Sequence, residues 1–135
     1  RQHILPQYKR IIDLVHAANK KFLLHSCGNI FEIMDDIIDL GIDAKHSNED
    51  QIAPFEKWIE LYNNKIGLFG GIDVNTLTLN NYDDIYRIIL EKGQKYRDAA
   101  SGYGIGSGNS IPGYVPVEGY MAMIDAVKEI RRREG

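Results

Sequence analysis

The sequence has a single cysteine, Cys27, so no disulfide can form within the chain. It also lacks an apolar run near the 18 residues that a membrane-spanning helix needs, and shows no signal segment or lipidation motif. The net charge is only −3, with acidic and basic residues interspersed, whereas nucleic-acid binding normally needs a basic face. We therefore expect a cytoplasmic protein with a free thiol and neither a membrane nor a nucleic-acid partner.

The 135 residues have the length of one domain, and their hydrophobic content of 44% is enough for a core. The chain begins at Arg1 and enters a predicted helix almost at once. We expect residues 1–135 to form one unit that is a piece of a longer protein.

Helix and strand signals alternate along this unit. Apolar residues at three- and four-residue steps predict helices over residues 6–18, 30–41, 54–62, 82–99 and around 120–130. Asn29 is a predicted N-cap, Gly41 a predicted helix end, and Gly93 is expected to weaken the end of the fourth helix. Short strands are predicted in "KFLLHSCG", "IDAKHS", "KIGLFGGID" and "GYGIGSG".

This alternation predicts an α/β fold with about four parallel strands joined by helical crossovers. Two architectures fit it, an open doubly wound sheet or part of an eight-stranded α/β barrel. An open sheet that binds a dinucleotide would need a phosphate-binding loop after its first strand, and "HSCGN" lacks the glycine pattern of such a loop.

His25 and Cys27 follow the first predicted strand. Residues two apart on an extended segment project from the same face, so imidazole and thiolate could reach one ion at about 2.0 to 2.3 Å, distances typical of zinc. The alternative is that both side chains pack beneath a helix. A metal site needs more ligands, and Glu49 or His46 at the next strand end could supply one. Glu49 could equally be a solvated loop residue.

Polar residues also follow the third and fourth strands. Asp73 could orient a substrate, but an aspartate in this position is equally a helix or turn cap. Ser107 and Asn109 belong to a glycine-rich loop where backbone can approach a ligand closely. Tyr114 lies near the same loop. With His46, we predict that Asp73, Ser107 and Tyr114 contact substrate.

Taken together, these motifs resemble the C-terminal portion of the uroporphyrinogen decarboxylase family. "HSCGN", "GIDAKHSNED", "GLFGGID" and "GSGNSIPGYVPVEGYMAMIDAV" follow one another in that family's order across the whole chain. Members of the family are (β/α)₈ barrels, or TIM barrels. The resemblance implies that this chain forms the C-terminal half of such a barrel, with the N-terminal half absent, and that it could associate with itself through its open edges.

The resemblance is closer to the branch of corrinoid-dependent methyltransferases, which hold zinc through His-x-Cys, an acidic residue and a second cysteine. It implies that His25 and Cys27 are zinc ligands, and that Glu49, 22 residues past the cysteine, or His46 is a third. Asn109 stands where the second cysteine is expected, and an amide oxygen is a poorer zinc ligand than a thiolate. Zinc would then be held less tightly, or have been lost.

The function implied is a zinc-dependent methyltransferase that moves a methyl group between a small molecule and a corrinoid protein. The alternative within the family is the decarboxylation of uroporphyrinogen, although the loop "GSGNS" lacks the histidine expected for it. A third hypothesis is a non-catalytic domain that binds a corrinoid or a partner protein. We expect the half barrel alone to be inactive.

Overall fold

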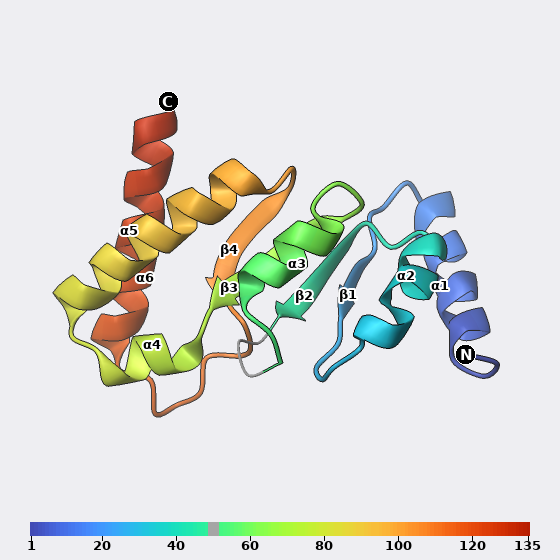
Figure 1. Ribbon diagram of the computed structural model, residues 1–135, viewed down its shortest axis with the longest axis horizontal. Helices are drawn as coiled ribbons and strands as arrows, with labels where there is room; N and C mark the ends of the chain where they lie inside the picture. Colours follow the sequence, from blue (N-terminus) through green and yellow to red (C-terminus); the bar gives the residue numbers. More distant parts are fainter. Residues whose placement is uncertain (49–51) are drawn as a thin grey trace.

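The computed structural model, which describes residues 1–48 and 52–135, contains a parallel sheet of four strands in the spatial order β1-β2-β3-β4. The strands are β1 (Leu23–His25), β2 (Ala44–Asn48), β3 (Gly67–Ile72) and β4 (Tyr103–Ser107). Each pairs in parallel with the next along the chain (Figure 1). A doubly wound sheet reverses its strand order, whereas a barrel keeps it sequential. The order therefore confirms the α/β prediction and favours the partial barrel.

The connections between the strands are helical, as predicted, with one addition. The helices are α1 (Leu5–Ala17), α2 (Phe31–Asp39), α3 (Phe55–Tyr62), α4 (Val74–Leu79), α5 (Tyr82–Ala99) and α6 (Val117–Glu134). In Figure 1, α3 lies over β2 and β3, α1 and α2 lie beyond β1, and α5 and α6 lie at the opposite end. The short helix α4 was missed, because its six residues are too few to show a helical period.

The ends of α1 and α2 show which of the predicted helix-end residues the structure confirms. Pro6 stands in the first turn of α1, where its missing N–H costs no hydrogen bond. The N-cap of α2 is Ile30 and not Asn29, although the Asn29 side chain accepts a bond from the Phe31 N–H at 3.3 Å. Gly41 follows the C-cap of α2 with φ +100°, as a helix-ending glycine should.

The helix α5 continues through Gly93 to Ala99, as predicted. A Cβ at position 93 would lie 2.7 Å from the Ile130 side chain and 2.8 Å from that of Ile105. The glycine therefore lets α5 approach α6 and β4 closely, and the tertiary packing outweighs its poor helix propensity.

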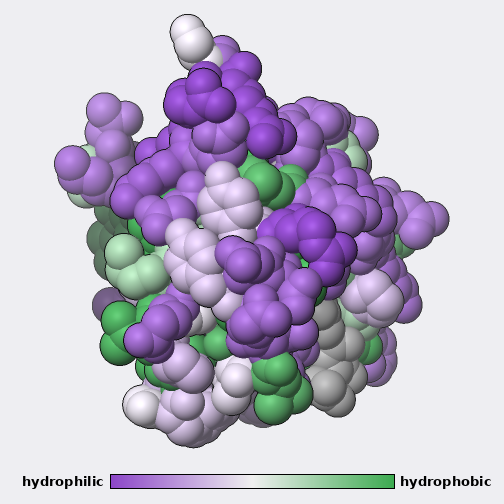
Figure 2. Space-filling view, turned by 90° about the vertical axis from the view of Figure 1, so that its left-hand side faces the viewer, coloured by the Kyte–Doolittle hydropathy of each residue, from purple (hydrophilic) through white to green (hydrophobic). Residues whose placement is uncertain are grey.

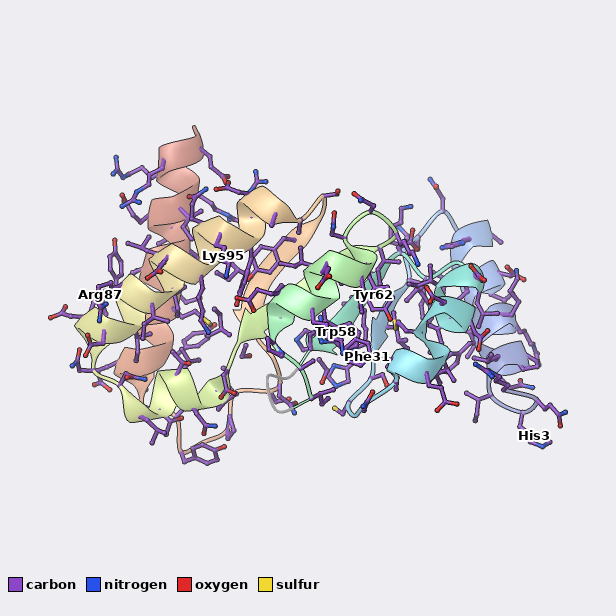
Figure 3. The ribbon with its side chains drawn as sticks, viewed as in Figure 1. His3, Phe31, Trp58, Tyr62, Arg87 and Lys95 are labelled. Carbon is purple, nitrogen blue, oxygen red and sulfur yellow. The ribbon has the colours of Figure 1, made fainter. Side chains whose placement is uncertain are left out.

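Two hydrophobic clusters stabilise the fold. The first lies under α2 and α3 and contains Phe31, Trp58 and Tyr62, whose rings stack between the two helices (Figure 3). The second joins α4, α5 and α6 to the end of β3 and is built from aliphatic and small residues, among them Leu77 and Ile89. The first cluster reaches from β1 to β4, through Leu24, Leu68 and Tyr103, whereas the second packs against Ile72 and Ile105 of β3 and β4.

The two faces of the sheet differ in exposure. Leu24 and Leu68 are buried beneath the helices, whereas Leu23 and Phe69, on the alternate face, are 49% and 40% exposed. In a barrel this second face lines the interior. Figure 2 shows that the end of the molecule formed by α4, α5 and α6 is hydrophilic over most of its upper part. None of the described helices is long and apolar enough to cross a membrane.

Candidate functional site

The carboxyl ends of all four strands lie along one edge of the sheet, the lower edge in Figure 1. Parallel pairing brings their polar side chains together there, as the alternating pattern predicts. The register places His25 beside His46, and Ile72 beside Ser107. The edge contains two neighbouring features, a cluster of histidine, cysteine and serine on β1 and β2, and a pocket on β3 and β4.

His25 and Cys27 face each other at this edge. The His25 Nε2 atom lies 3.5 Å from the Cys27 Sγ atom, and both residues are exposed. Nitrogen and sulfur ligands about 2.0 and 2.3 Å from one tetrahedral zinc ion lie about 3.5 Å from each other. The pair therefore has the separation that a shared ion requires, and the alternative, that the two side chains pack beneath a helix, is wrong.

His46 extends this pair inward. Its Nδ1 lies 2.8 Å from His25 Nδ1, and its Nε2 lies 3.2 Å from the Ser107 carbonyl oxygen. A carbonyl oxygen can only accept, so a neutral His46 carries its proton on Nε2 and accepts at Nδ1 from the His25 Nδ1–H. The His25 lone pair is then on Nε2 and faces the Cys27 sulfur. The network thus fixes the tautomer that metal ligation needs.

Ser47 adds a hydroxyl to the cluster. Its Oγ donates to Cys27 Sγ at 3.2 Å, and a donor of this kind stabilises a thiolate. Ser47 is buried and has φ +69°, a left-handed conformation that is uncommon for a residue with a side chain. The register between β2 and β3 shifts over Lys45–Asn48, so the backbone leaves the regular ladder at this point. Unusual backbone geometry that persists in a folded protein is often associated with function.

Lys45 is the residue that sequence reasoning missed. Its side chain is 0% exposed, although lysine is rarely fully buried, and its Nζ lies 4.4 Å from the centre of the Trp58 ring. The amine donates to backbone and side-chain oxygens at the ends of β1 and β2. The sequence contained a signal for this burial. Lys45 lies between Ala44 and His46 in the predicted strand, so its side chain points to the face opposite theirs, which the helices cover.

A pocket of about 350 Å³ lies beside the cluster, at the ends of β3 and β4. Asp73, Asn109 and Tyr114 line it, together with Asn48 from β2. Its walls are polar and apolar in similar measure, and it is wide enough for a small molecule. The structure thus brings three of the predicted site residues into one pocket.

Several of these residues also have structural hydrogen bonds. Asp73 caps α4 by accepting from the Asn75 N–H at 2.6 Å, which is the capping role considered as the alternative for it. Ser107 Oγ donates to the Asn109 carbonyl oxygen at 2.5 Å, and the Asn109 side-chain oxygen accepts from the Ser110 N–H at 2.8 Å. These bonds shape the loop that borders the pocket.

Among the described residues, two of the four predicted metal ligands contact each other. His25 and Cys27 converge, Asn109 lines the pocket, and Glu49 lies outside the described residues. Within residues 1–48 and 52–135, no group of three or more His, Cys, Asp or Glu side chains is placed to hold a metal ion. The described residues therefore fit a metal as a pair of donors oriented by His46.

Comparison with known proteins gives two results. The family model for uroporphyrinogen decarboxylase (URO-D) matches residues 1–130. Among solved structures, a methyltransferase from Methanosarcina mazei superimposes with a TM-score of 0.72 and 24% sequence identity, covering 97% of this chain and 36% of its own. No curated protein matches the chain. The chain thus spans about a third of the length of that methyltransferase, and the likeness shows that its fold is part of a TIM barrel.

Proposed function

The chain belongs to the uroporphyrinogen decarboxylase family, and on this premise we propose that the complete protein is a zinc-dependent methyltransferase that moves a methyl group to or from a corrinoid protein. The observation that carries the proposal is the 3.5 Å contact between His25 Nε2 and Cys27 Sγ. A histidine whose lone pair is held toward a thiol by a second histidine has the arrangement of a metal ligand. The methyltransferase from Methanosarcina mazei, which shares the fold, supports this branch of the family.

His25 and Cys27 would hold the zinc ion, and Glu49 and Asn109 stay the predicted further ligands. Bound zinc lowers the pKa of a coordinated thiol or water and so supplies a nucleophile at neutral pH. The residues of the chain prepare this site. His46 holds the His25 ring in place through Nδ1, and Ser47 donates to the sulfur.

The neighbouring pocket would receive the small molecule that gives or accepts the methyl group. Asp73 and Tyr114 line it, and Ser107 sets the path of its loop by bonding to the Asn109 carbonyl. His46 connects the two features, because one ring nitrogen faces His25 and the other the Ser107 carbonyl. A substrate in the pocket would therefore lie next to the proposed metal pair.

Metal binding by the full-length protein tests the proposal. We expect one zinc ion per chain, and we expect Co²⁺ to give the charge-transfer absorption of a metal–thiolate bond. Cys27→Ser should remove that absorption, and His25→Gln should weaken zinc binding at least tenfold, as loss of a direct ligand requires. His3→Gln is the matched control, because His3 lies near the N-terminus, away from the sheet (Figure 3).

Three outcomes would decide against the proposal. If the protein binds no zinc, or binds it equally well without Cys27, the zinc chemistry is wrong. If the full-length protein instead decarboxylates uroporphyrinogen, the alternative within the family holds. A protein that binds a corrinoid partner but catalyses neither reaction would be the non-catalytic domain.

A further inference from the structure

Lys45 lies behind the His25–Cys27 pair and is not one of the residues that line the neighbouring pocket. Its Nζ donates to the carbonyl oxygens of Ser26 at 3.3 Å, His46 at 3.1 Å and Ser47 at 3.1 Å. Ser26 is the residue between His25 and Cys27, so this single amine contacts both strand ends that carry the cluster. The side chain approaches from the helix-covered face of the sheet, whereas the two histidines lie on the other face.

The amine also contacts the side chain of Asn48. Asn48 Oδ1 accepts from Lys45 Nζ at 3.0 Å, and its Nδ2 donates to the Phe69 carbonyl at 2.9 Å. Asn48 is 1% exposed. The contacts of Lys45 thus continue through Asn48 to the middle of β3, and they link the ends of β1 and β2 to that strand where the β2–β3 register shifts.

Burial makes these contacts strong. A lysine ammonium that is fully removed from water must be hydrogen-bonded to remain in place, and charge-assisted bonds are about twice as strong as neutral ones. The Trp58 ring beneath the amine, 4.4 Å from its centroid, adds a cation–π contact. If one of these carbonyls rotated away, the buried ammonium would lose a hydrogen-bond partner.

The hydrogen bonds from Lys45 to these carbonyls hold the backbone of β2 in an unusual conformation. Ser47 adopts φ +69°, a conformation that costs a residue with a side chain free energy unless its surroundings impose it. The carbonyl of His46, the residue before Ser47, and the carbonyl of Ser47 itself both accept from Lys45 Nζ. This conformation lets Ser47 Oγ reach the Cys27 sulfur at 3.2 Å, while His46 stays 2.8 Å from His25.

We propose that Lys45 is a positioning residue, whose buried amine clamps the carbonyls of Ser26, His46 and Ser47 and thereby holds His25, Cys27 and His46 in their mutual geometry. It touches neither metal nor substrate in this role. The inference about the side-chain geometry stands on the contacts alone, and its consequence for zinc rests on the proposed function.

The test compares Lys45→Met with a control variant in the full-length protein. Methionine keeps an unbranched apolar chain against Trp58 but removes all donors to the carbonyls. The first readout is metal-free, the nuclear Overhauser contact between the ring protons of His25 and His46, whose ring centroids lie 5.0 Å apart. We expect this contact in the wild type and expect Lys45→Met to lose it.

The second readout is zinc affinity, which we expect Lys45→Met to reduce by about 10- to 100-fold, as do other changes that disturb the support of a metal ligand. Ile89→Ala is the control for lost stability, because Ile89 is 0% exposed in the second hydrophobic cluster. It should lower the urea midpoint but keep both the ring contact and the zinc affinity.

A double variant makes the test independent of overall folding. Glycine adopts positive φ without strain, so Ser47→Gly should make the backbone of β2 less dependent on the clamp. Lys45→Met should therefore lower zinc affinity by a smaller factor in the Ser47→Gly background than in the wild type. Equal factors in the two backgrounds would show that Lys45 does not act through this backbone.

The outcomes separate this inference from the proposed function. If Lys45→Met keeps the ring contact and binds zinc within about twofold of the wild type, or if the wild type itself lacks the ring contact, the clamp is overturned. If the wild type has the contact and Lys45→Met loses it, but neither binds zinc, the clamp stands and the zinc proposal fails.

Discussion

The first two strands of the sheet end in reactive side chains, whereas the last two are rich in glycine. His25 and Cys27 follow β1, and the buried Lys45 supports them from β2. On β3 and β4 the corresponding positions include Gly70 and Gly71, with φ of +111° and +91°, and glycines 104, 106 and 108. One half of the edge therefore supplies donor atoms, and the other half leaves room for a ligand and for close packing.

The two hydrophobic clusters differ in the same sense. Under β1 and β2, large aromatic rings fill the space between helices, with Phe31 and Trp58 stacked at 4.3 Å between ring centroids. In the second cluster, small residues allow α4, α5 and α6 to touch, and α6 presents Gly119, Ala122 and Ala126 to the cluster. The first half should be sensitive to loss of volume and the second to its addition.

Trp58→Ala should have the largest effect of any single core substitution in the first half. Trp58 is 0% exposed, and its truncation leaves a cavity beneath the Lys45 amine, so we expect a loss of about 3–5 kcal/mol in the free energy of unfolding. Urea denaturation followed by circular dichroism measures it.

Trp58→Phe is the matched control for this change. Among the described residues, the indole N–H of Trp58 is buried without a hydrogen-bond partner, so phenylalanine removes no hydrogen bond and keeps the stacking on Phe31. It should cost clearly less than alanine. Equal losses for the two variants would contradict the view that ring volume stabilises the first half.

In the second half, Gly119→Ala should be destabilising through added volume. A Cβ at this position would lie 2.1 Å from the Leu77 carbonyl oxygen, which belongs to the backbone of α4 and cannot turn away as a side chain could. We expect a loss of about 1–3 kcal/mol from overpacking. Gly113→Ala, where a Cβ meets no described atom within 4 Å, should change the urea midpoint little. Comparable losses for the two variants would remove the contrast between the halves.

The two halves of the edge should also respond differently in metal binding. His46→Ala removes the partner that orients His25, so we expect zinc affinity to fall by about 10- to 100-fold. Asn109→Ala should change it less, because the Asn109 side chain lines the pocket and bonds to the Ser110 N–H. Isothermal titration with zinc measures both. A larger loss for Asn109→Ala than for His46→Ala would contradict this order.

Local patterns were sufficient to predict the strands and the longer helices, because burial and turn chemistry repeat at short range. The same alternation predicted that His25 and Cys27 share a face, and the structure confirms their contact. Parallel pairing was also enough to predict that Asp73 and Tyr114 would gather at one edge, where they line one pocket.

Packing between elements far apart in the chain could not be predicted from local sequence patterns. Gly93 carries a poor helix propensity, and only the contact of α5 with Ile105 and Ile130 shows why it is there. Lys45 was overlooked because a lysine is ordinarily exposed, and its burial depends on Trp58 from a different element. The hydrogen bonds that orient His25 likewise need His46 to contact the Ser107 carbonyl, which is 61 residues later in the chain. No local sequence pattern predicts a contact over that separation.

Charge should contribute the smallest effect, at the amino-terminal edge of the first half. Asp43 accepts from Lys21 Nζ at 2.7 Å and from the Phe22 N–H at 2.8 Å, and these donors hold the pKa of its carboxyl well below the usual range. The folded protein thus favours the ionised form. Its stabilising contribution is complete above the unfolded pKa of about 4 and is lost as the pH falls from there toward the folded pKa.

Asp43→Asn measures this contribution, which should be about 0.5–1 kcal/mol because ion pairs near the surface are weak. The difference in urea midpoint between wild type and Asp43→Asn should be constant near pH 5 and should shrink as the pH is lowered toward 2. Trp58→Phe, on the same half, should show no such convergence with the wild type. A difference that does not depend on pH would mean that Asp43 stabilises the β1–β2 junction through neutral hydrogen bonds alone, and that charge plays no part in holding the first half together.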